Sequence, residues 1–114
     1  MKRQFAIALG AVLLTWAAVP ALAGGTWPQG AAAAAKPLIA EQCIKCHVVP
    51  GFPADRIQPA VEAPSFAQVA ADKTKYPDDV LRKFLRQPHY PMKGFVMSKR
   101  DIANILAFLH SLRK

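Results

Sequence analysis

The stretch Cys43-Ile44-Lys45-Cys46-His47 decides the fold of this chain, because it reads C-x-x-C-H. On one helical turn Cys43 and Cys46 are i,i+3 neighbours, and His47 lies i+4 from Cys43, so all three side chains project from one face. From that face two thiols can bond covalently to the edge of a porphyrin, while the imidazole reaches the iron. The spacing therefore predicts the attachment of one c-type haem.

Redox dithiols and structural zinc sites also use a C-x-x-C pair. The chain has only these two cysteines, which excludes a Cys₄ zinc site. A Cys₂His₂ site would need His89 or His110, which are both distant in the sequence. A thioredoxin-like dithiol would lie in a βαβ pattern, and none is visible around the motif. The dithiol stays as an alternative to the haem.

The first 23 residues have the pattern of a secretory signal peptide. Lys2 and Arg3 precede an apolar run over residues 5–19, and Ala21-Leu22-Ala23 is a small-x-small cleavage site. The alternative is a membrane anchor, but the run is short for a spanning helix, which needs about 20 residues. We expect cleavage after Ala23 and a periplasmic location.

Removal of residues 1–23 leaves 91 of the 114 residues, which is enough for one small domain. Without Lys2 and Arg3 the 15 basic residues fall to 13 against 7 acidic ones, a formal net charge of +6. On an exported domain this charge favours acidic protein patches or an anionic membrane surface over nucleic acid. The alternative is a solvated basic surface with no selected partner. We expect redox protein partners with acidic docking patches, no stable membrane span, and a monomer.

Helical periodicity without sustained strand alternation predicts an all-α fold. Residues 24–36, rich in Gly, Ala and Pro, are expected to form a flexible leader with helical potential at Ala31–Ala35, and residues 37–114 the domain. Loop is expected over residues 48–63. The expected helices are Leu38–His47, with Pro37 before it, then Phe66–Ala71, Asp78–Gln87, and one that follows Ser98.

Capping residues and apolar stripes define these helices further. Ser65 and Ser98 are the expected N-caps, and Asp101 at N3 would complete a capping box with Ser98. Two stripes are expected to be buried: Val80, Leu81, Phe84 and Leu85 in the third helix, and Ile102, Ile105, Leu106, Leu109 and Leu112 in the last.

A haem iron held by His47 has a sixth position, for which Met92, Met97, His89 and His110 are candidates. His110 lies off the apolar face of the last helix and is interpreted as a surface residue. His89 follows a proline in a loop and stays as an alternative.

Capping logic separates the two methionines. With Ser98 as the N-cap, Met97 is N′ and pairs with Ile102 in a hydrophobic staple, which gives it a structural role. Met92 has no periodic partner and lies in an irregular loop that Pro91 stiffens. A thioether on a rigid loop suits an axial ligand, so Met92 is the expected distal ligand and Met97 the alternative.

With these motifs the chain resembles a small monohaem class I cytochrome c. The resemblance covers nearly all of residues 37–113 and rests on CIKCH, APSFAQVA, PHYPM and DIANILAFLHSL. Such cytochromes commonly place the axial Met five residues before an apolar-Ser/Thr helix start, which again selects Met92 over Met97.

The resemblance implies a cytochrome c-like fold of about four helices around one covalently attached haem. The first and last helices would cross, with Leu38 or Ile39 against Phe108 and Leu109. It also implies that a proline carbonyl orients the proximal His47. Pro64 is the best match for that proline, although Ala63 stands where the family often has Gly.

His/Met ligation leaves no open position on the iron, and the thioether raises the reduction potential. Apolar surroundings, expected to include Phe66, Phe84, Phe95 and Leu109, would act in the same direction. We therefore expect a one-electron carrier and not an enzyme. Its donor would be a periplasmic dehydrogenase or a membrane quinol oxidoreductase, and its acceptor a terminal oxidase or reductase.

Four cations are expected to form a basic rim around the haem edge that steers acidic partners: Lys45, Lys93, Lys99 and Arg100. Two alternatives to the free carrier also contain haem. One is a dedicated electron-transfer subunit of a larger dehydrogenase complex. The other is a haem enzyme or gas sensor with an open sixth site, which would bind carbon monoxide or cyanide.

Overall fold

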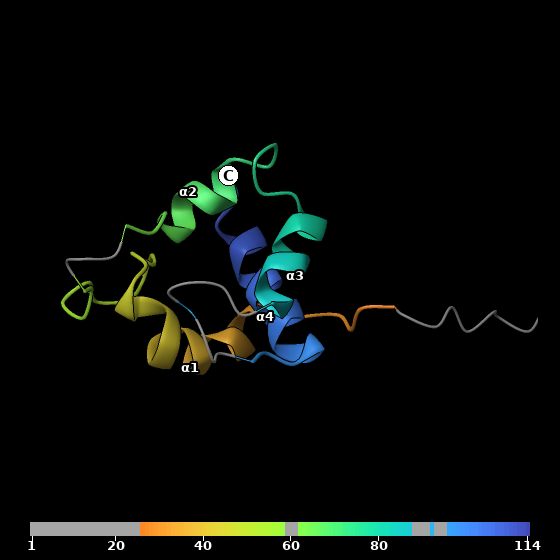
Figure 1. The fold of residues 1–114 in the computed structure, drawn as a ribbon, viewed down its shortest axis with the longest axis horizontal. Helices are drawn as coiled ribbons and strands as arrows, with labels where there is room; N and C mark the ends of the chain where they lie inside the picture. Colours follow the sequence, from red (N-terminus) through yellow and green to blue (C-terminus); the bar gives the residue numbers. More distant parts are fainter. Residues whose placement is uncertain (1–25, 59–61, 88–91, 93–95) are drawn as a thin grey trace, which may run out of the picture.

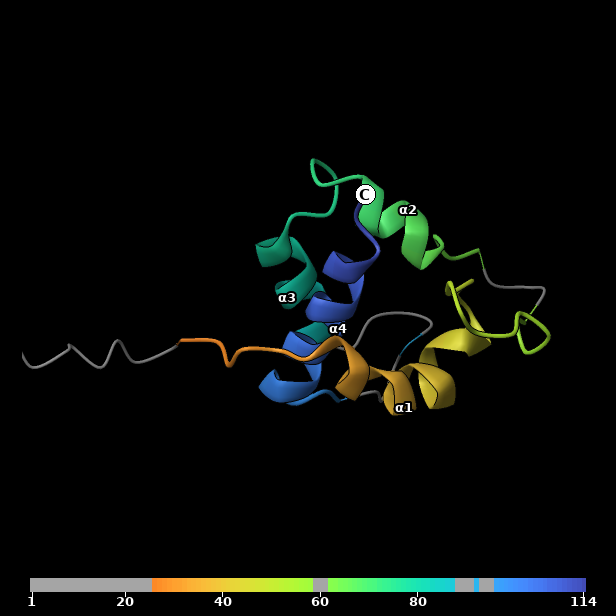
Figure 2. The ribbon, with the colours of Figure 1, turned by 180° about the vertical axis from the view of Figure 1, so that it is seen from behind.

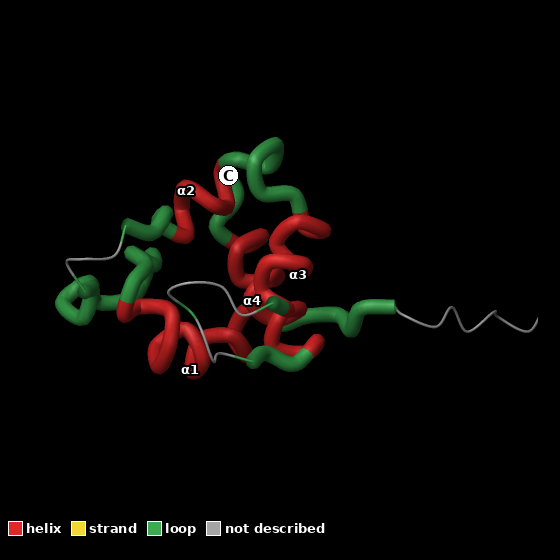
Figure 3. Tube along the Cα trace, in the orientation of Figure 1, coloured by secondary structure: helices red, strands yellow, loops and turns green. Residues whose placement is uncertain are grey.

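The structure is a computed structural model of the chain, and it describes residues 26–58, 62–87, 92 and 96–114. In these ranges the order of elements is α1 (Ala32–Gln42), the 3₁₀ helix η1 (Cys43–Lys45), α2 (Phe66–Ala71), α3 (Asp78–Arg86) and α4 (Lys99–Ser111). Helices joined by loops make up all of the described part, which contains no strand (Figure 3). The expected all-α class is confirmed.

The core forms where α1 crosses and packs against α4 (Figure 1). Ile39 of α1 is fully buried, and it belongs to the same apolar cluster as Ile102, Phe108 and Leu109 of α4. These aliphatic and aromatic side chains exclude water from the crossing, and this burial is the main driving force for packing two amphipathic helices. The crossing of the first and last helices is therefore as the resemblance implied.

The first helix differs from the expectation at both ends. It begins at Ala32, so Pro37 lies inside it and not before it. The alanines ahead of Pro37 have high helix propensity, and Ala35 becomes buried in the core. At the other end the α-helix stops at Gln42, and the motif continues as a 3₁₀ turn in which Cys43 O accepts from the N–H groups of Cys46 and His47 at 3.1 and 2.9 Å.

Residues 26–31, called here the N-terminal segment, lie along the start of α4 (Figure 2). The Ala31 N–H donates to Asn104 Oδ1 at 2.9 Å, which satisfies a buried amide. Gly30 packs against the backbone of Ala103 so closely that an added Cβ would lie 1.9 Å from the Ala103 carbonyl oxygen. The described part of the expected leader therefore packs on α4. The hydrogen bond from Ala31 to Asn104 and the close contact of Gly30 with the Ala103 backbone hold it there.

The other three helices follow the expected bounds. Helix α2 spans Phe66–Ala71 as expected, and α3 ends at Arg86, one residue earlier than expected. Ser98 caps α4, since its Oγ accepts from the Asp101 N–H at 3.1 Å while Asp101 Oδ2 accepts from the Ser98 N–H at 3.0 Å. Ser65 forms a second capping box with Gln68. Residues 48–58 contain no helix or strand, as expected for the loop.

A polar cluster ties α3 to the end of the chain. Asp78 Oδ1 accepts hydrogen bonds from His110 Nε2 at 2.8 Å and Arg113 Nη2 at 3.3 Å, and Arg82 lies 4.0 Å from the other carboxylate oxygen. Arg113 Nε also donates to Ala70 O at 3.3 Å, so Arg113 joins α2 to α3. Partial burial alone would raise the pKa of Asp78, but the hydrogen bonds and charges of His110 and Arg113 outweigh it and leave this pKa below its usual value.

No helix within the described ranges has the length and apolar character needed to cross a membrane. The predicted signal peptide, residues 1–23, lies outside these ranges.

Candidate functional site

A predominantly apolar cavity of about 460 Å³ opens between the C-x-x-C-H motif and helices α2, α3 and α4. This volume is within the range of about 300–1,000 Å³ that is usual for ligand sites. The motif contributes Cys43, Cys46 and His47 to its wall, and Met92 and Met97 also line it. The structure therefore brings together every residue that the sequence analysis predicted as a haem attachment point or ligand.

The two cysteines are three positions apart in the chain and are not joined in a disulfide. Cys43 is buried, and Cys46 is partly exposed. Burial raises the pKa of Cys43 to about 11, and the neighbouring Cys46 adds to the rise. An attacking thiol needs a lowered pKa, so burial disfavours Cys43 as the nucleophile of a dithiol.

The imidazole of His47 is held by a backbone carbonyl. Its Nδ1–H donates to Pro64 O, with a distance of 2.7 Å between the two atoms. The Val48 carbonyl accepts from the Phe66 N–H at 2.9 Å, which keeps the chain after Pro64 against the motif. Because Nδ1 carries the hydrogen of this hydrogen bond, the lone pair of the neutral imidazole lies on Nε2. An iron ligand requires this tautomer. Pro64 thus supplies the accepting carbonyl as expected, and Ala63 in place of Gly does not change this.

The phenyl ring of Phe66 supports this imidazole from the side. The ring centroids of His47 and Phe66 lie 5.4 Å apart in an edge-to-face arrangement, and Phe66 in turn contacts Phe108 of α4 in the same way at 6.3 Å. The histidine is therefore oriented by one hydrogen bond and one aromatic contact, and the aromatic contact connects it through Phe66 to α4.

The methionine and histidine candidates for the second ligand differ in burial and in their position relative to the cavity. Met97 is 8% exposed and belongs to the same buried cluster as Ile102, as the staple requires. Met92 is partly buried and packs against that cluster from the cavity side. His110 binds Asp78 and is not part of the cavity wall. His89, Pro91, Lys93 and Phe95 lie outside the described residues.

The stripe of α3 that was expected to be buried is buried only in part. Leu81 is buried and Leu85 is half-buried, but Val80 is 45% exposed and Phe84 is 50% exposed. All four side chains line the cavity. The prediction of burial was wrong for Val80 and Phe84 because their apolar face points toward the cavity and not toward another helix.

The polar edge of the cavity was missed in the sequence. Lys75 and Tyr76 line it just before α3, with Lys75 Nζ 5.3 Å from the centroid of the Tyr76 ring, and Glu62 lines it as well. The place of Lys75 and Tyr76 depends on how the loop before α3 folds back, which no local sequence pattern predicts. Two of the four cations expected to form the basic rim, Lys99 and Arg100, instead contact the N-terminal segment.

The donors in the cavity fit haem better than a bare metal ion. No group of three or more His, Cys, Asp or Glu side chains suited to a metal ion occurs among the residues that the structure describes. One imidazole, two thioethers and two thiols on apolar walls suit an iron that brings its own macrocycle. This donor set also argues against structural zinc, which usually takes four protein ligands.

No family model matches the chain, and no solved structure matches it at a significant level. Among curated proteins, the chain is similar to cytochrome c-552 of Bradyrhizobium diazoefficiens, with 35% identity over 71 residues, or 62% of this chain. The chain spans 64% of the length of that relative. Together with the cavity and its donors, this similarity supports a small c-type cytochrome with one covalently bound haem c.

Proposed function

We propose that this protein is a periplasmic one-electron carrier in which Cys43 and Cys46 attach the haem and His47 and Met92 ligate its iron. The observation that carries the proposal is the His47–Pro64 hydrogen bond of 2.7 Å inside an apolar cavity that both cysteines line. A histidine fixed in this tautomer and rotamer is prepared to bind iron before the haem arrives.

The chain's residues act on the haem in three ways. Bound haem supplies an iron that gains and loses one electron. His47 donates from Nε2 while Pro64 fixes its other nitrogen, and Met92 offers a thioether that favours the reduced iron. The aromatic and aliphatic walls, including Phe66 and Leu109, exclude water and lower the local dielectric, which raises the reduction potential further.

If His47 and Met92 held the haem iron, no ligand position would be left for a substrate, so we assign electron transfer and not catalysis to the protein. The haem-containing subunit of a larger dehydrogenase complex is the same domain with a permanent partner, and co-purification from the native membrane and periplasm separates the two. An open-site sensor would instead require that Met92 does not bind the iron, so that its sixth position stays open.

We further propose export through residues 1–23 and transient partners with acidic docking patches. The support is the composition of the sequence, with 13 basic against 7 acidic residues after position 23. Steering by exposed charges weakens with salt, because the Debye length is about 10 Å at 0.1 M. The rate of electron transfer to a physiological partner should therefore fall as ionic strength rises, and a rate indifferent to salt would contradict the docking proposal.

The visible absorption spectrum of the exported protein tests the ligand assignment. Wild type should show sharp c-type bands on reduction and the weak far-red band of an iron–methionine bond on oxidation. Met92→Ala should lose the far-red band and bind carbon monoxide readily when reduced, because its sixth position opens.

The matched control is Met97→Ala, which removes the other thioether of the cavity. It should keep the far-red band. Loss of that band in Met97→Ala and not in Met92→Ala would reverse the assignment, and a high-spin wild-type spectrum would favour the open-site sensor. If the protein carried no haem when made in a strain that attaches haem to other proteins, the dithiol alternative would remain.

A further inference from the structure

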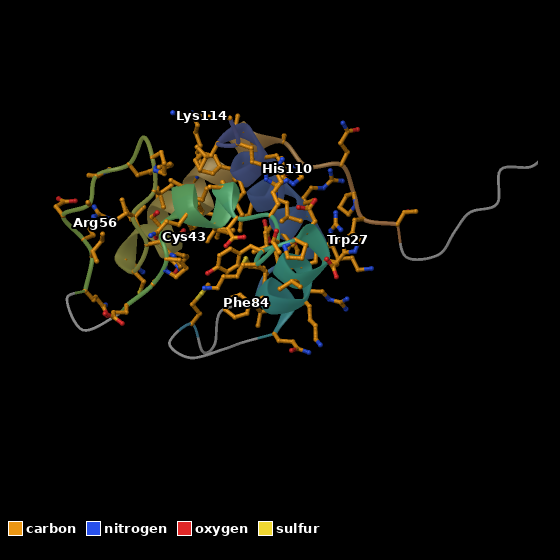
Figure 4. The ribbon with its side chains drawn as sticks, turned by 90° about the horizontal axis from the view of Figure 1, so that it is seen from above. Trp27, Cys43, Arg56, Phe84, His110 and Lys114 are labelled. Atoms are coloured by element: carbon orange, nitrogen blue, oxygen red, sulfur yellow. The ribbon has the colours of Figure 1, made fainter. Side chains whose placement is uncertain are left out.

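A second cavity, of about 430 Å³, lies on the opposite face of α3 from the haem cavity, and it is called here the Trp27 pocket. Positions 79, 82, 83 and 86 of α3 line it, together with residue 87 just after the helix, whereas positions 80, 81, 84 and 85 line the haem cavity. With 3.6 residues per turn these two sets project in opposite directions. Figure 4 shows Trp27 and Cys43 toward opposite ends of the domain. The two cavities therefore share none of the lining residues that the structure describes.

The wall of the Trp27 pocket opposite α3 is the indole ring of the N-terminal segment. Three cations surround the ring: Arg82 at 5.4 Å, Arg86 at 5.8 Å and Lys99 at 5.8 Å from its centroid. Cation–π attraction accounts for the position of the ring. It leaves the net positive charge of these side chains in place, because an aromatic quadrupole carries no net charge.

The charge of the pocket is mostly uncompensated. Among the residues that the structure describes, its lining holds Arg82, Lys83 and Arg86 against a single carboxylate, Asp79. Arg82 reaches Asp78 only at 4.0 Å, and its Nε is buried without a hydrogen-bond partner among the described residues. A guanidinium offers five N–H donors, and burial of an unmade hydrogen bond costs free energy. The pocket thus combines excess positive charge, two guanidinium groups and incomplete hydrogen bonding.

We propose that the Trp27 pocket binds a phosphate-type oxyanion. Planar guanidinium groups bind phosphate oxygens in pairs. Arg82 and Arg86 are one helical turn apart on α3, so both can face a single tetrahedral anion, with Lys83 adding charge. The indole ring limits the depth of the pocket and shields the anion from water. Two sources offer this chemistry: free phosphate and the phosphodiester headgroup of a membrane lipid.

The first test uses the haem-loaded protein in its reduced form, titrated with inorganic phosphate at constant ionic strength set by chloride. The NMR signals of the Trp27 indole N–H and the arginine Nε–H groups should shift and saturate. Arg86→Gln should weaken binding about tenfold, which corresponds to about 1.4 kcal/mol, because it removes a charged hydrogen-bond donor. Arg56→Gln removes the same charge from the distant loop and should bind phosphate as wild type does.

A second variant guards against a change in fold. Lys83→Gln leaves both arginines and their contacts with Trp27 in place, and it should weaken phosphate binding less than Arg86→Gln does. Unchanged haem spectra in all variants would show that the domain remains intact. A shift that fails to saturate, or that weakens equally in Arg56→Gln and Arg86→Gln, would overturn the proposal.

Vesicles distinguish the two sources. Co-sedimentation with phosphatidylglycerol vesicles, lost in Arg86→Gln and absent with phosphatidylcholine vesicles, would assign the site to an anionic lipid headgroup. Saturable phosphate binding without co-sedimentation would assign it to the free anion. The proposal does not depend on the haem ligands, so a change in the assignment of Met92 would leave it standing.

Discussion

At the level of single residues, two methionines of one cavity differ in burial. Met97 is buried in the same cluster as Ile102, whereas Met92 is only partly buried and packs against that cluster. Local sequence distinguished them, because Met97 takes the N′ position that a staple requires and Met92 has no helical register to satisfy.

Met97→Ala should destabilise the folded protein by about 2–4 kcal/mol, because truncation of a buried methionine leaves a cavity in the core. Chemical unfolding of the haem-loaded protein would measure the loss. Val96→Ala is the matched control, since Val96 is the preceding residue and is 84% exposed. It should change the free energy of unfolding by less than about 0.5 kcal/mol. Equal losses in the two variants would show that the Met97 side chain has no packing role.

At the level of elements, helix starts were predictable where one local interaction defines them. Ser65 and Ser98 each accept from the backbone three residues later, and the sequence between cap and partner contains the whole interaction. The start of α1 was not predictable in this way. It depends on Ala31 and Ala35 meeting α4, about 70 residues further along the chain, and Pro37 gave a local signal for a later start.

The cap of α4 gives a direct test at this scale. Ser98→Ala should cost about 0.5–2 kcal/mol of stability, because the Asp101 N–H loses its acceptor at the start of the helix. Ser98→Gly is the matched variant and should cost only a few tenths of a kcal/mol. Thermal unfolding of both would show the difference. A glycine variant less stable than the alanine variant would exclude the capping explanation.

At the level of the whole molecule, contacts between segments distant in the sequence determine which cavities and polar clusters form. The haem cavity could be foreseen from the motif and from the apolar stripes. The Trp27 pocket, the Lys75–Tyr76 edge and the Asp78 cluster could not, since each joins segments that have no shared local pattern. Phe84 is likewise an apolar side chain that is half exposed, and its position is explained by the cavity that it lines.

The Asp78 cluster predicts a pH-dependent stability. The folded state lowers the pKa of Asp78, so the cluster contributes its full stabilisation above the unfolded pKa of about 3.9, and loses it as pH falls through the lower folded value. Asp78→Asn should be less stable than wild type at pH 6, and the difference should shrink below about pH 4. Unfolding in urea across this range would measure it.

Asp79→Asn is the control for this prediction. It removes the neighbouring carboxylate from the same helix start and so reproduces the loss of the favourable helix-dipole interaction. Its effect on stability should be smaller than that of Asp78→Asn at pH 6, because Asp78 alone binds His110 and Arg113 among the described residues. A difference between Asp78→Asn and wild type that stays constant from pH 6 to pH 3 would show that charge has no part in the cluster.

The packing of the N-terminal segment on α4 also has a consequence for maturation. If cleavage falls after Ala23, only Gly24, Gly25 and Thr26 separate the new amino terminus from Trp27, which already contacts α3 and α4. A protease needs several residues in extended form on both sides of the bond that it cuts. Processing must therefore come before the segment docks, so the order of events would be translocation, cleavage and then closure of the domain around its haem.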